Sequence, residues 1–163
     1  MDLAPFRDFL IACVGASASF IGLLFVALSV VMGRQGNNTE LAFNDRRLAE
    51  SAFTALANVF FVSLVALIPS TNIGWPALVM AILGLRTSYR LIVHARKIKT
   101  EIFWISTSVL VYSLEAIYAI ILIFNPMSNA GLSFIIFILI ALFGGGLIRS
   151  WELTGIRGEK RNS

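Results

Sequence analysis

Long uncharged stretches separated by short polar segments dominate the chain. The stretches 9–32, 51–85, 102–114 and 116–148 contain no charged side chain. The second and the fourth are each interrupted by turn-forming residues, at 69–76 and 125–129, where proline removes a backbone donor and Asn and Gly accept dihedral angles that helices avoid. About 20 apolar residues suffice to cross a bilayer as a helix. The pattern predicts an all-α single domain over residues 1–163 with five transmembrane helices, at about 9–32, 49–69, 74–94, 102–124 and 130–151.

A four-helix alternative would place one of the two polar turns in lipid, where its backbone groups would lack hydrogen bonds. Tryptophans support five helices, because Trp75, Trp104 and Trp151 all fall near predicted helix ends. At the membrane–water interface the indole N–H keeps its contact with water. The polar segment before the second helix holds Asn44 and Asp45, and either residue is a suitable N-cap for that helix.

Positive charges predict the orientation of the helices. Under the five-helix prediction, the opposite face carries Arg7 alone, and the two turns there carry no charge. Positive residues favour the cytoplasmic side, so we expect the N-terminus outside and the C-terminus inside, with the basic face near anionic lipid headgroups. The basic residues on the inner side are Arg34, Arg46, Arg47, Arg96, Lys97, Lys99, Arg157, Lys160 and Arg161.

Composition agrees with a membrane protein and excludes several kinds of site. Hydrophobic residues make up 58% of the chain and charged residues 13%, about half the charge of a typical soluble domain. A single cysteine, Cys13, excludes an internal disulfide and a multi-cysteine metal centre, and a single histidine, His94, excludes histidine clusters. We find no nucleophile–base pair, phosphate loop or metal-ligand spacing. The sequence therefore predicts no enzyme activity, no cofactor or metal, and no nucleic-acid partner.

The two turns share a pattern that suggests an internal repeat. They read Pro69-Ser-Thr-Asn-Ile-Gly74 and Pro126-Met-Ser-Asn-Ala-Gly131, at an offset of 57 residues. The same offset aligns Asn58 with Glu115. Helices two and three and helices four and five are thus two consecutive hairpins, either a parallel tandem duplication or two turns of convergent chemistry.

Glu115 is the most informative position, since it lies near the middle of the fourth helix. An ionised carboxylate costs at least about 2.5 kcal/mol at the bilayer centre, so Glu115 must be protonated, paired or in contact with water. Helical spacing places it on a polar stripe with Trp104, Ser108, Tyr112 and either Tyr118 or Ala119. The stripe lines a path for a proton or cation, or it hydrogen-bonds a neighbouring helix.

The third helix carries cations along one face, at Arg86, Arg90 and Lys97. Arg86 lies about 12 Å inside the predicted helix end. It either pairs with Glu115, with Asn58 at a similar depth, or extends to the lipid headgroups.

Small residues mark two further features. Gly15, Ser19 and Gly22 in the first helix belong to small-xxx-small pairs, which let helices approach closely. Gly144, Gly145 and Gly146 in the fifth helix predict either close packing or a hinge.

Residues 15–30, GASASFIGLLFVALSV, resemble the opening helix of small multi-span membrane proteins found across bacteria without assigned function. The resemblance implies the bacterial inner membrane as location and carries no activity.

Five short helices enclose little space, and small-residue faces favour lateral association, so we expect a homo-oligomer. The first functional hypothesis is a homo-oligomeric channel or permeation pathway for a small ion, with the Glu115 stripe on the path. The alternative is a non-conducting scaffold or regulatory subunit of a larger membrane complex.

Overall fold

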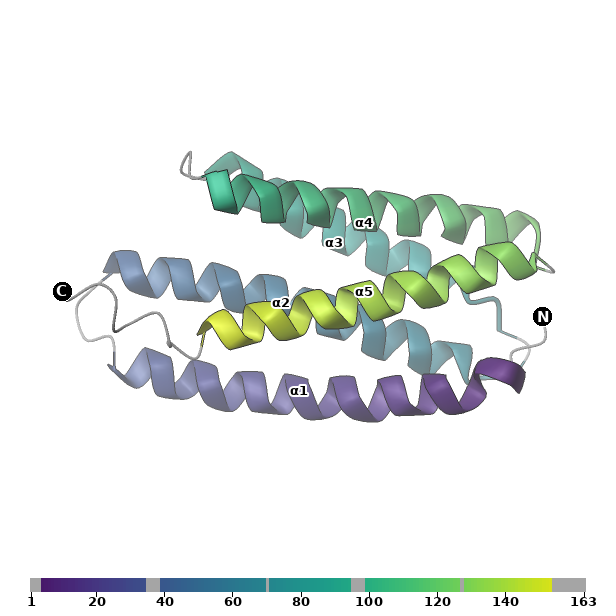
Figure 1. The fold of residues 1–163 in the computed structure, drawn as a ribbon, viewed down its shortest axis with the longest axis horizontal. Coiled ribbons are helices and arrows are strands. Elements are labelled where there is room, and N and C mark those ends of the chain that lie inside the picture. The colour runs from purple at the N-terminus through teal and green to yellow at the C-terminus, as the bar shows by residue number, and fades with distance from the viewer. Residues whose placement is uncertain (1–3, 35–38, 70, 95–98, 127, 154–163) are drawn as a thin grey trace.

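The computed structural model describes residues 4–34, 39–69, 71–94, 99–126 and 128–153. Among these residues there are five α-helices and no strand, and one turn of 3-10 helix (Ala4–Phe6) precedes the first α-helix. The all-α prediction with five helices is therefore confirmed. Consecutive helices are antiparallel, so α1, α3 and α5 begin at the same end of the bundle (Figure 1). The helices are α1 (Arg7–Arg34), α2 (Thr39–Ala66), α3 (Gly74–His94), α4 (Lys99–Phe124) and α5 (Asn129–Leu153).

Helix boundaries agree with the prediction except at the start of α2. This helix begins at Thr39, ten residues before the predicted start, and the proposed N-caps Asn44 and Asp45 lie inside it. That prediction was wrong because charged residues marked the limit of the apolar stretch, whereas they continue a helix readily. The segment from Thr39 onward contains neither Gly nor Pro before Pro69. At the other end, Leu67 N–H donates to Leu64 O, which closes a tight last turn.

Over the residues that the structure describes, four of the helices are long and apolar enough to cross a membrane: α1, α2, α4 and α5. The exception is α3, because Arg86 and Arg90 lie in its second half and lower its hydropathy. Its length of 21 residues is similar to the 20-residue span of α2. Four such apolar helices indicate an integral membrane protein.

Helices α2 to α5 form a closed ring, in which α2 contacts α3, α3 contacts α4, α4 contacts α5 and α5 contacts α2. Helix α1 packs outside this ring, against α2 and α5 (Figure 1). Helices α2 and α4 thus occupy opposite corners of a four-helix bundle. Side chains that α2 and α4 both direct inward meet in the centre of the bundle.

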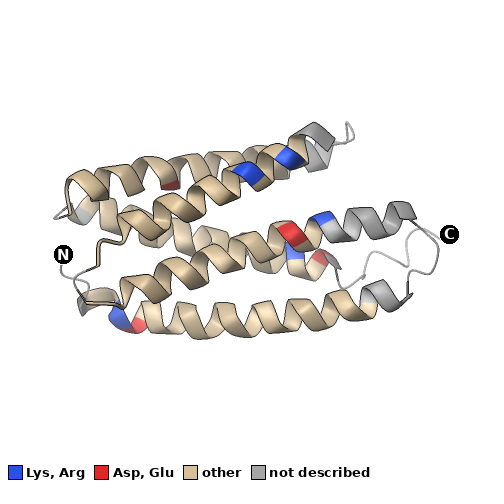
Figure 2. Cartoon of the chain, turned by 180° about the vertical axis from the view of Figure 1, so that it is seen from behind, with Lys and Arg blue, Asp and Glu red and all other residues tan. Residues whose placement is uncertain are grey.

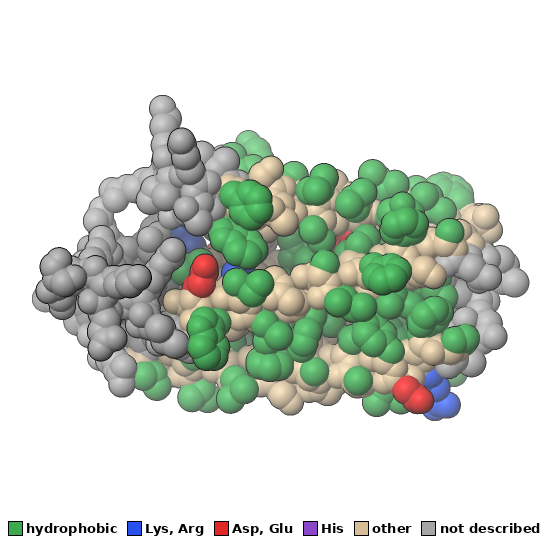
Figure 3. Space-filling model, in the orientation of Figure 1, with side chains coloured by type: hydrophobic (Ala, Val, Ile, Leu, Met, Phe, Trp, Pro, Cys, Tyr) green, Lys and Arg blue, Asp and Glu red, His purple; other side chains and the backbone are tan. Residues whose placement is uncertain are grey.

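The outer surface of the helices is apolar. Large exposed side chains include Phe25 of α1, Phe103 and Phe124 of α4 and Phe137 of α5, and hydrophobic side chains cover most of the described face in Figure 3. Charged residues gather mainly in the half of the bundle where α5 ends, apart from the start of α1 and one position on α4 (Figure 2). A surface of this kind is suited to lipid rather than to water.

Two glycines allow α3 to lie unusually close to α4. A Cβ atom at Gly74 would be 2.6 Å from the backbone oxygen of Ala119, and a Cβ at Gly84 would overlap the ring of Tyr112. Asn72 secures the start of α3, because its Oδ1 accepts from Gly74 N–H while its Nδ2 donates to Leu122 O of α4. The second turn is capped differently, with Ser128 Oγ accepting from Gly131 N–H.

Candidate functional site

The centre of the bundle holds a buried carboxyl–amide pair. Asn58 Nδ2 of α2 donates to Glu115 Oε2 of α4 at 2.8 Å, and both side chains have no exposed surface. This hydrogen bond joins the two helices at opposite corners of the ring. The two remaining oxygens, Asn58 Oδ1 and Glu115 Oε1, are buried and have no hydrogen-bond partner among the described residues.

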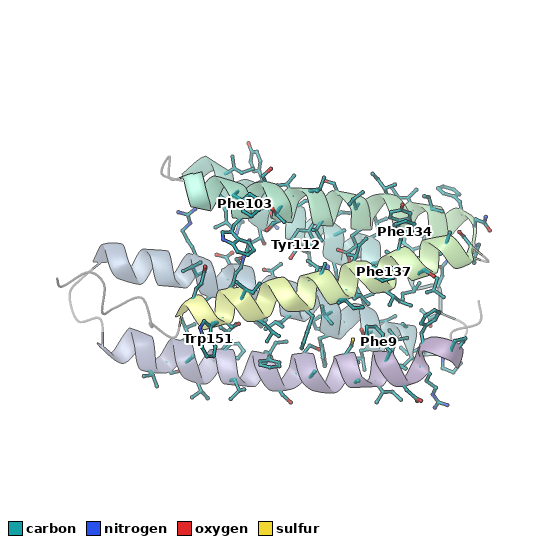
Figure 4. All side chains as sticks on the ribbon, in the orientation of Figure 1. Phe9, Phe103, Tyr112, Phe134, Phe137 and Trp151 are labelled. Carbon is teal, nitrogen blue, oxygen red and sulfur yellow. The ribbon has the colours of Figure 1, made fainter. Side chains whose placement is uncertain are left out.

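Tyr112 lies one turn before Glu115 on the same inner face of α4 and is 4% exposed. Figure 4 shows its side chain in the space between α4 and α5. Its ring occupies the room left by the missing side chain of Gly84 on α3. Along the inner face of α4, Tyr112 lies between Ser108 on one side and Glu115 on the other. Tyr112 therefore connects the central pair to a second polar group.

That second group is built around Arg149 of α5. Its Nη2 donates to Ser108 Oγ at 2.7 Å and to the backbone oxygen of Trp104 at 3.3 Å. The guanidinium carbon lies 5.9 Å from the centre of the Trp104 ring, within range of a cation–π interaction. Ser108 also donates to Trp104 O at 2.9 Å. Two neutral acceptors and an aromatic face thus hold the cation.

The two groups form one polar line along the inner face of α4. Ser108, Tyr112 and Glu115 follow each other at spacings of four and three residues, which corresponds to about 10 Å along the helix axis. Ser108 and Arg149 are half-buried, whereas Tyr112 and Glu115 are buried. The line therefore runs inward from the half-buried arginine and ends at the sealed pair. Trp104 lies in the half of α4 that contains its first residue, and Arg149 of α5 lies beside it.

The structure brings together most of the residues of the predicted stripe. Ser108, Tyr112 and Glu115 share the inner face with buried Ala119, and Asn58 meets Glu115 across the bundle. Tyr118 lies beside the stripe and stacks on Phe134 of α5, with ring centres 4.4 Å apart.

The proposed Arg86–Glu115 pair is wrong. Arg86 is exposed on α3, while Glu115 bonds to Asn58 through one oxygen and has no partner at the other. Helical spacing placed Arg86 at a suitable depth without fixing which face of α3 it occupies. Its exposure agrees with the alternative, an arginine that extends towards the headgroups.

The glycine triplet of α5 divides into two parts. Helix α5 continues without a break through Gly144, Gly145 and Gly146. A Cβ at Gly146 would be 2.9 Å from Leu56 Cγ of α2, so close packing accounts for this residue. At Gly144 and Gly145 a Cβ would meet nothing within 4 Å. For these two residues the hinge stays a prediction.

The small-xxx-small residues of α1 predicted to pack closely, Gly15, Ser19 and Gly22, do not pack against other described residues. Ser19 is exposed, as are Gly15 and Gly22, and a Cβ at either glycine would meet nothing within 4 Å. Helix α1 instead directs Leu10, Cys13, Ser17 and Leu24 inward. Close approach through Gly15, Ser19 and Gly22 therefore requires another molecule.

Sequence reasoning missed the part that Arg149 and Gly84 play. Arg149 was not predicted to belong to the polar stripe. Helices α4 and α5 form a hairpin about the turn at 125–128, so counting outward from that turn places Arg149 level with Trp104 and Ser108. That signal was present in the sequence. No comparable signal marks Gly84, because its role depends on the rotamer of Tyr112.

The basic residues used to predict orientation lie largely outside the side chains that the structure describes, as does His94. Two exceptions are Arg7, which is exposed, and Arg47, whose Nη2 donates to Leu91 O of α3 at 2.9 Å. Among the described residues, no group of three His, Cys, Asp or Glu side chains could hold a metal ion.

Comparison with known proteins gives no family for this chain, because no family model, no curated protein and no solved structure matches it.

Proposed function

We propose that the chain is a membrane permeation pathway for a small ion, and that the pathway runs inside each subunit along the polar line of α4. The observation that carries this proposal is the Asn58–Glu115 pair at the centre of the bundle. Tyr112 and the Arg149 group link this pair towards one end. In this arrangement Glu115 is the site that the ion or its proton must pass.

The incomplete hydrogen bonding of the pair favours a functional role over a purely structural one. Burying a polar atom without a partner costs about 1–3 kcal/mol, and buried polar groups are paired in the great majority of cases. A pair that served only to join α2 and α4 would gain from a complete set of hydrogen bonds. Two open acceptors beside an ionisable group are instead suited to a transient occupant.

The proposal includes five membrane-spanning helices, with α3 as the fifth. Arg86 and Arg90 are exposed in the second half of α3, where long side chains can reach the headgroups. The N-terminus is then outside, the C-terminus inside, and the basic face meets anionic lipid at the inner membrane of a bacterium.

We also propose that subunits associate through α1, as a homo-oligomer. Only 17% of the α1 span is buried, against 56% of the α2 span. The exposed positions Gly15, Ser19 and Gly22 offer a flat surface for a second helix. The polar stripe of α4 faces the interior of its own bundle, so this association does not need to line a central pore.

The second candidate function, a non-conducting scaffold or regulatory subunit, is favoured by the same exposed face of α1. A transmembrane helix of a different protein fits there as well as a second copy does. Under this alternative, Asn58 and Glu115 would only hold α2 and α4 together.

Ion flux measured in proteoliposomes tests the proposal. Gradients of K⁺, Na⁺, Cl⁻ and H⁺ are applied to the wild type and to Glu115→Gln. Glu50→Gln is the matched control, since it makes the same chemical change at an exposed position of α2. We expect flux in the wild type and in the control, and at least a tenfold loss in Glu115→Gln. A folded wild type without flux under any of the gradients would favour the scaffold.

A further inference from the structure

The central pair has one hydrogen bond and lacks one hydrogen. Glu115 Oε2 accepts from Asn58 Nδ2, which leaves Glu115 Oε1 and Asn58 Oδ1 without partners. An ionised carboxylate can only accept hydrogen bonds, and an amide oxygen can only accept as well. The two open oxygens therefore cannot satisfy each other as long as Glu115 carries a charge.

One proton removes this conflict. A protonated carboxyl group has an O–H donor and a carbonyl acceptor, and an amide has an N–H donor and a carbonyl acceptor. A proton on Oε1 supplies a donor of the kind that Asn58 Oδ1 lacks, so the acid and the amide then offer one donor and one acceptor each. The opposite orientation of the amide also needs a proton on Glu115, in that case on Oε2, because Oδ1 and Oε2 would then be two acceptors 2.8 Å apart.

A metal cation fits the same site poorly. Hard cations such as Ca²⁺ and Mg²⁺ take about six or more oxygen ligands, whereas the pair offers two open oxygens in a core whose other side chains are mostly apolar. In the part of the chain that the structure describes, no third acidic, histidine or cysteine side chain joins them. Two open acceptor oxygens are too few for such a cation, but they are suited to binding a proton.

The surroundings contain no described cation that would keep Glu115 ionised. Among the described residues, Glu115 has a hydrogen bond to Asn58 of α2, and its other oxygen has no partner. Arg149, on α5, donates to Ser108 Oγ and to Trp104 O. On α3, Arg86 and Arg90 are exposed.

We infer that the Asn58–Glu115 pair is a proton-binding site, occupied in the resting protein, and that the ion carried by the proposed pathway is the proton. The second half of this inference rests on the proposed function, and the first half does not. Uptake of a proton converts the Glu115 carboxylate to a carboxylic acid and removes one negative charge from the core. Release towards the other side of the bundle restores the carboxylate and opens the pair again.

Infrared spectroscopy of the full chain in liposomes at neutral pH tests the site directly. We expect a carboxylic-acid C=O band in the wild type and in Glu50→Gln, and its loss in Glu115→Gln. In Asn58→Leu the band should remain and shift to higher frequency, because the acid loses a hydrogen-bond partner. A Glu115 that gives carboxylate bands at neutral pH would overturn the proton-binding site.

The variants are expected to fold, since glutamine at position 115 presents one acceptor and one N–H donor, as the protonated acid does. A second readout needs no variant at all. Exposed carboxyl groups are ionised at neutral pH, so an acid band in the wild type that disappears at alkaline pH belongs to a buried group. Absence of any such band contradicts the inference even if Glu115→Gln fails to fold.

Flux measurements separate this inference from the proposed function. If Glu115→Gln abolishes a K⁺ or Na⁺ flux and the wild type shows no acid band, the proposed pathway is supported. The inference that Glu115 binds a proton and that the carried ion is the proton is then wrong. An acid band in a protein that conducts no ion keeps the proton-binding site and overturns the pathway. Proton flux together with the acid band supports both.

Discussion

The bundle contains two polar groups, the Arg149 group and the Asn58–Glu115 pair. Each places an ionisable side chain among apolar helices, but the two side chains are stabilised differently. Arg149 is half-buried, and its Nη2 bonds to two neutral acceptors beside an aromatic ring. Glu115 is fully buried with one hydrogen bond and one open oxygen. A long guanidinium side chain reaches partners near a helix end, whereas a short carboxyl group near mid-helix depends on what its neighbour offers. The contacts of Arg149 are those expected of a structural anchor, whereas the open oxygens of the Glu115 pair are those expected of a site that binds and releases a proton.

The largest expected effect on stability comes from breaking the central pair on one side. Asn58→Leu leaves Glu115 without its hydrogen bond inside the core, and we expect a loss of about 3 kcal/mol, the upper end for a buried group left unpaired. Glu115→Gln keeps both a donor and an acceptor and should change stability by less than about 1 kcal/mol. Thermal unfolding in detergent measures both.

The double variant Asn58→Leu with Glu115→Leu sharpens this result. It removes both polar groups at once, so no buried atom is left unpaired, and it should be more stable than Asn58→Leu alone. A double variant as unstable as the sum of its parts would show that packing, rather than hydrogen bonding, holds α2 and α4 at this level.

The link between the two groups depends on Gly84. A methyl group at this position overlaps the Tyr112 ring, so Gly84→Ala should displace the ring and cost about 2 kcal/mol through overpacking. Proton flux should fall together with stability, because Tyr112 connects the Arg149 group to Glu115. Gly144→Ala is the matched control, since a Cβ there meets nothing within 4 Å. A control that loses as much stability would refute this account of Gly84.

Much of this arrangement could be predicted from the sequence. Uncharged stretches and turn residues gave five helices, including both ends of α3. The helical period placed Ser108, Tyr112 and Glu115 on one face, and the 57-residue offset named Asn58 as the counterpart of Glu115, which is the residue it bonds. That agreement leaves the tandem duplication a prediction, since the two turns are capped by different residues.

The face of each helix that turns inward was harder to predict. In a soluble protein the apolar face is the buried one, but lipid is as apolar as a leucine side chain. In α1, Leu24 is buried while its neighbours Leu23 and Phe25 are exposed, and hydropathy does not separate them. For the same reason the exposed side of α3 could not be recognised, and the pairing of Arg86 with Glu115 stayed open as one of two alternatives.

A smaller loss of stability is expected when Arg149 loses one of its hydrogen-bond acceptors. Ser108→Ala removes one acceptor from Arg149, and we expect a loss of about 1 kcal/mol in thermal unfolding, the usual worth of such a hydrogen bond. Thr107→Val is the control, because the neighbouring hydroxyl donates only to Phe103 O in its own helix. If Arg149 serves as an anchor alone, proton flux in Ser108→Ala should stay within about twofold of the wild type. A loss of flux as large as that in Glu115→Gln would instead assign Ser108 to the pathway.

The smallest effect on the folded subunit is expected on the outer face of α1. Gly15 and Gly22 are exposed and a Cβ atom at either meets nothing within 4 Å, so leucine at both positions should not destabilise the folded chain. If subunits associate through this face, the bulky side chains will keep the helices apart. The mass of the complex in detergent, measured by light scattering, should then fall towards that of one chain of 17.9 kDa. A mass that is unchanged from that of a wild-type oligomer would show that subunits associate through another face.

In either case flux per subunit should persist, because the proposed pathway lies inside each bundle. Loss of flux on dissociation would place the conducting route between subunits.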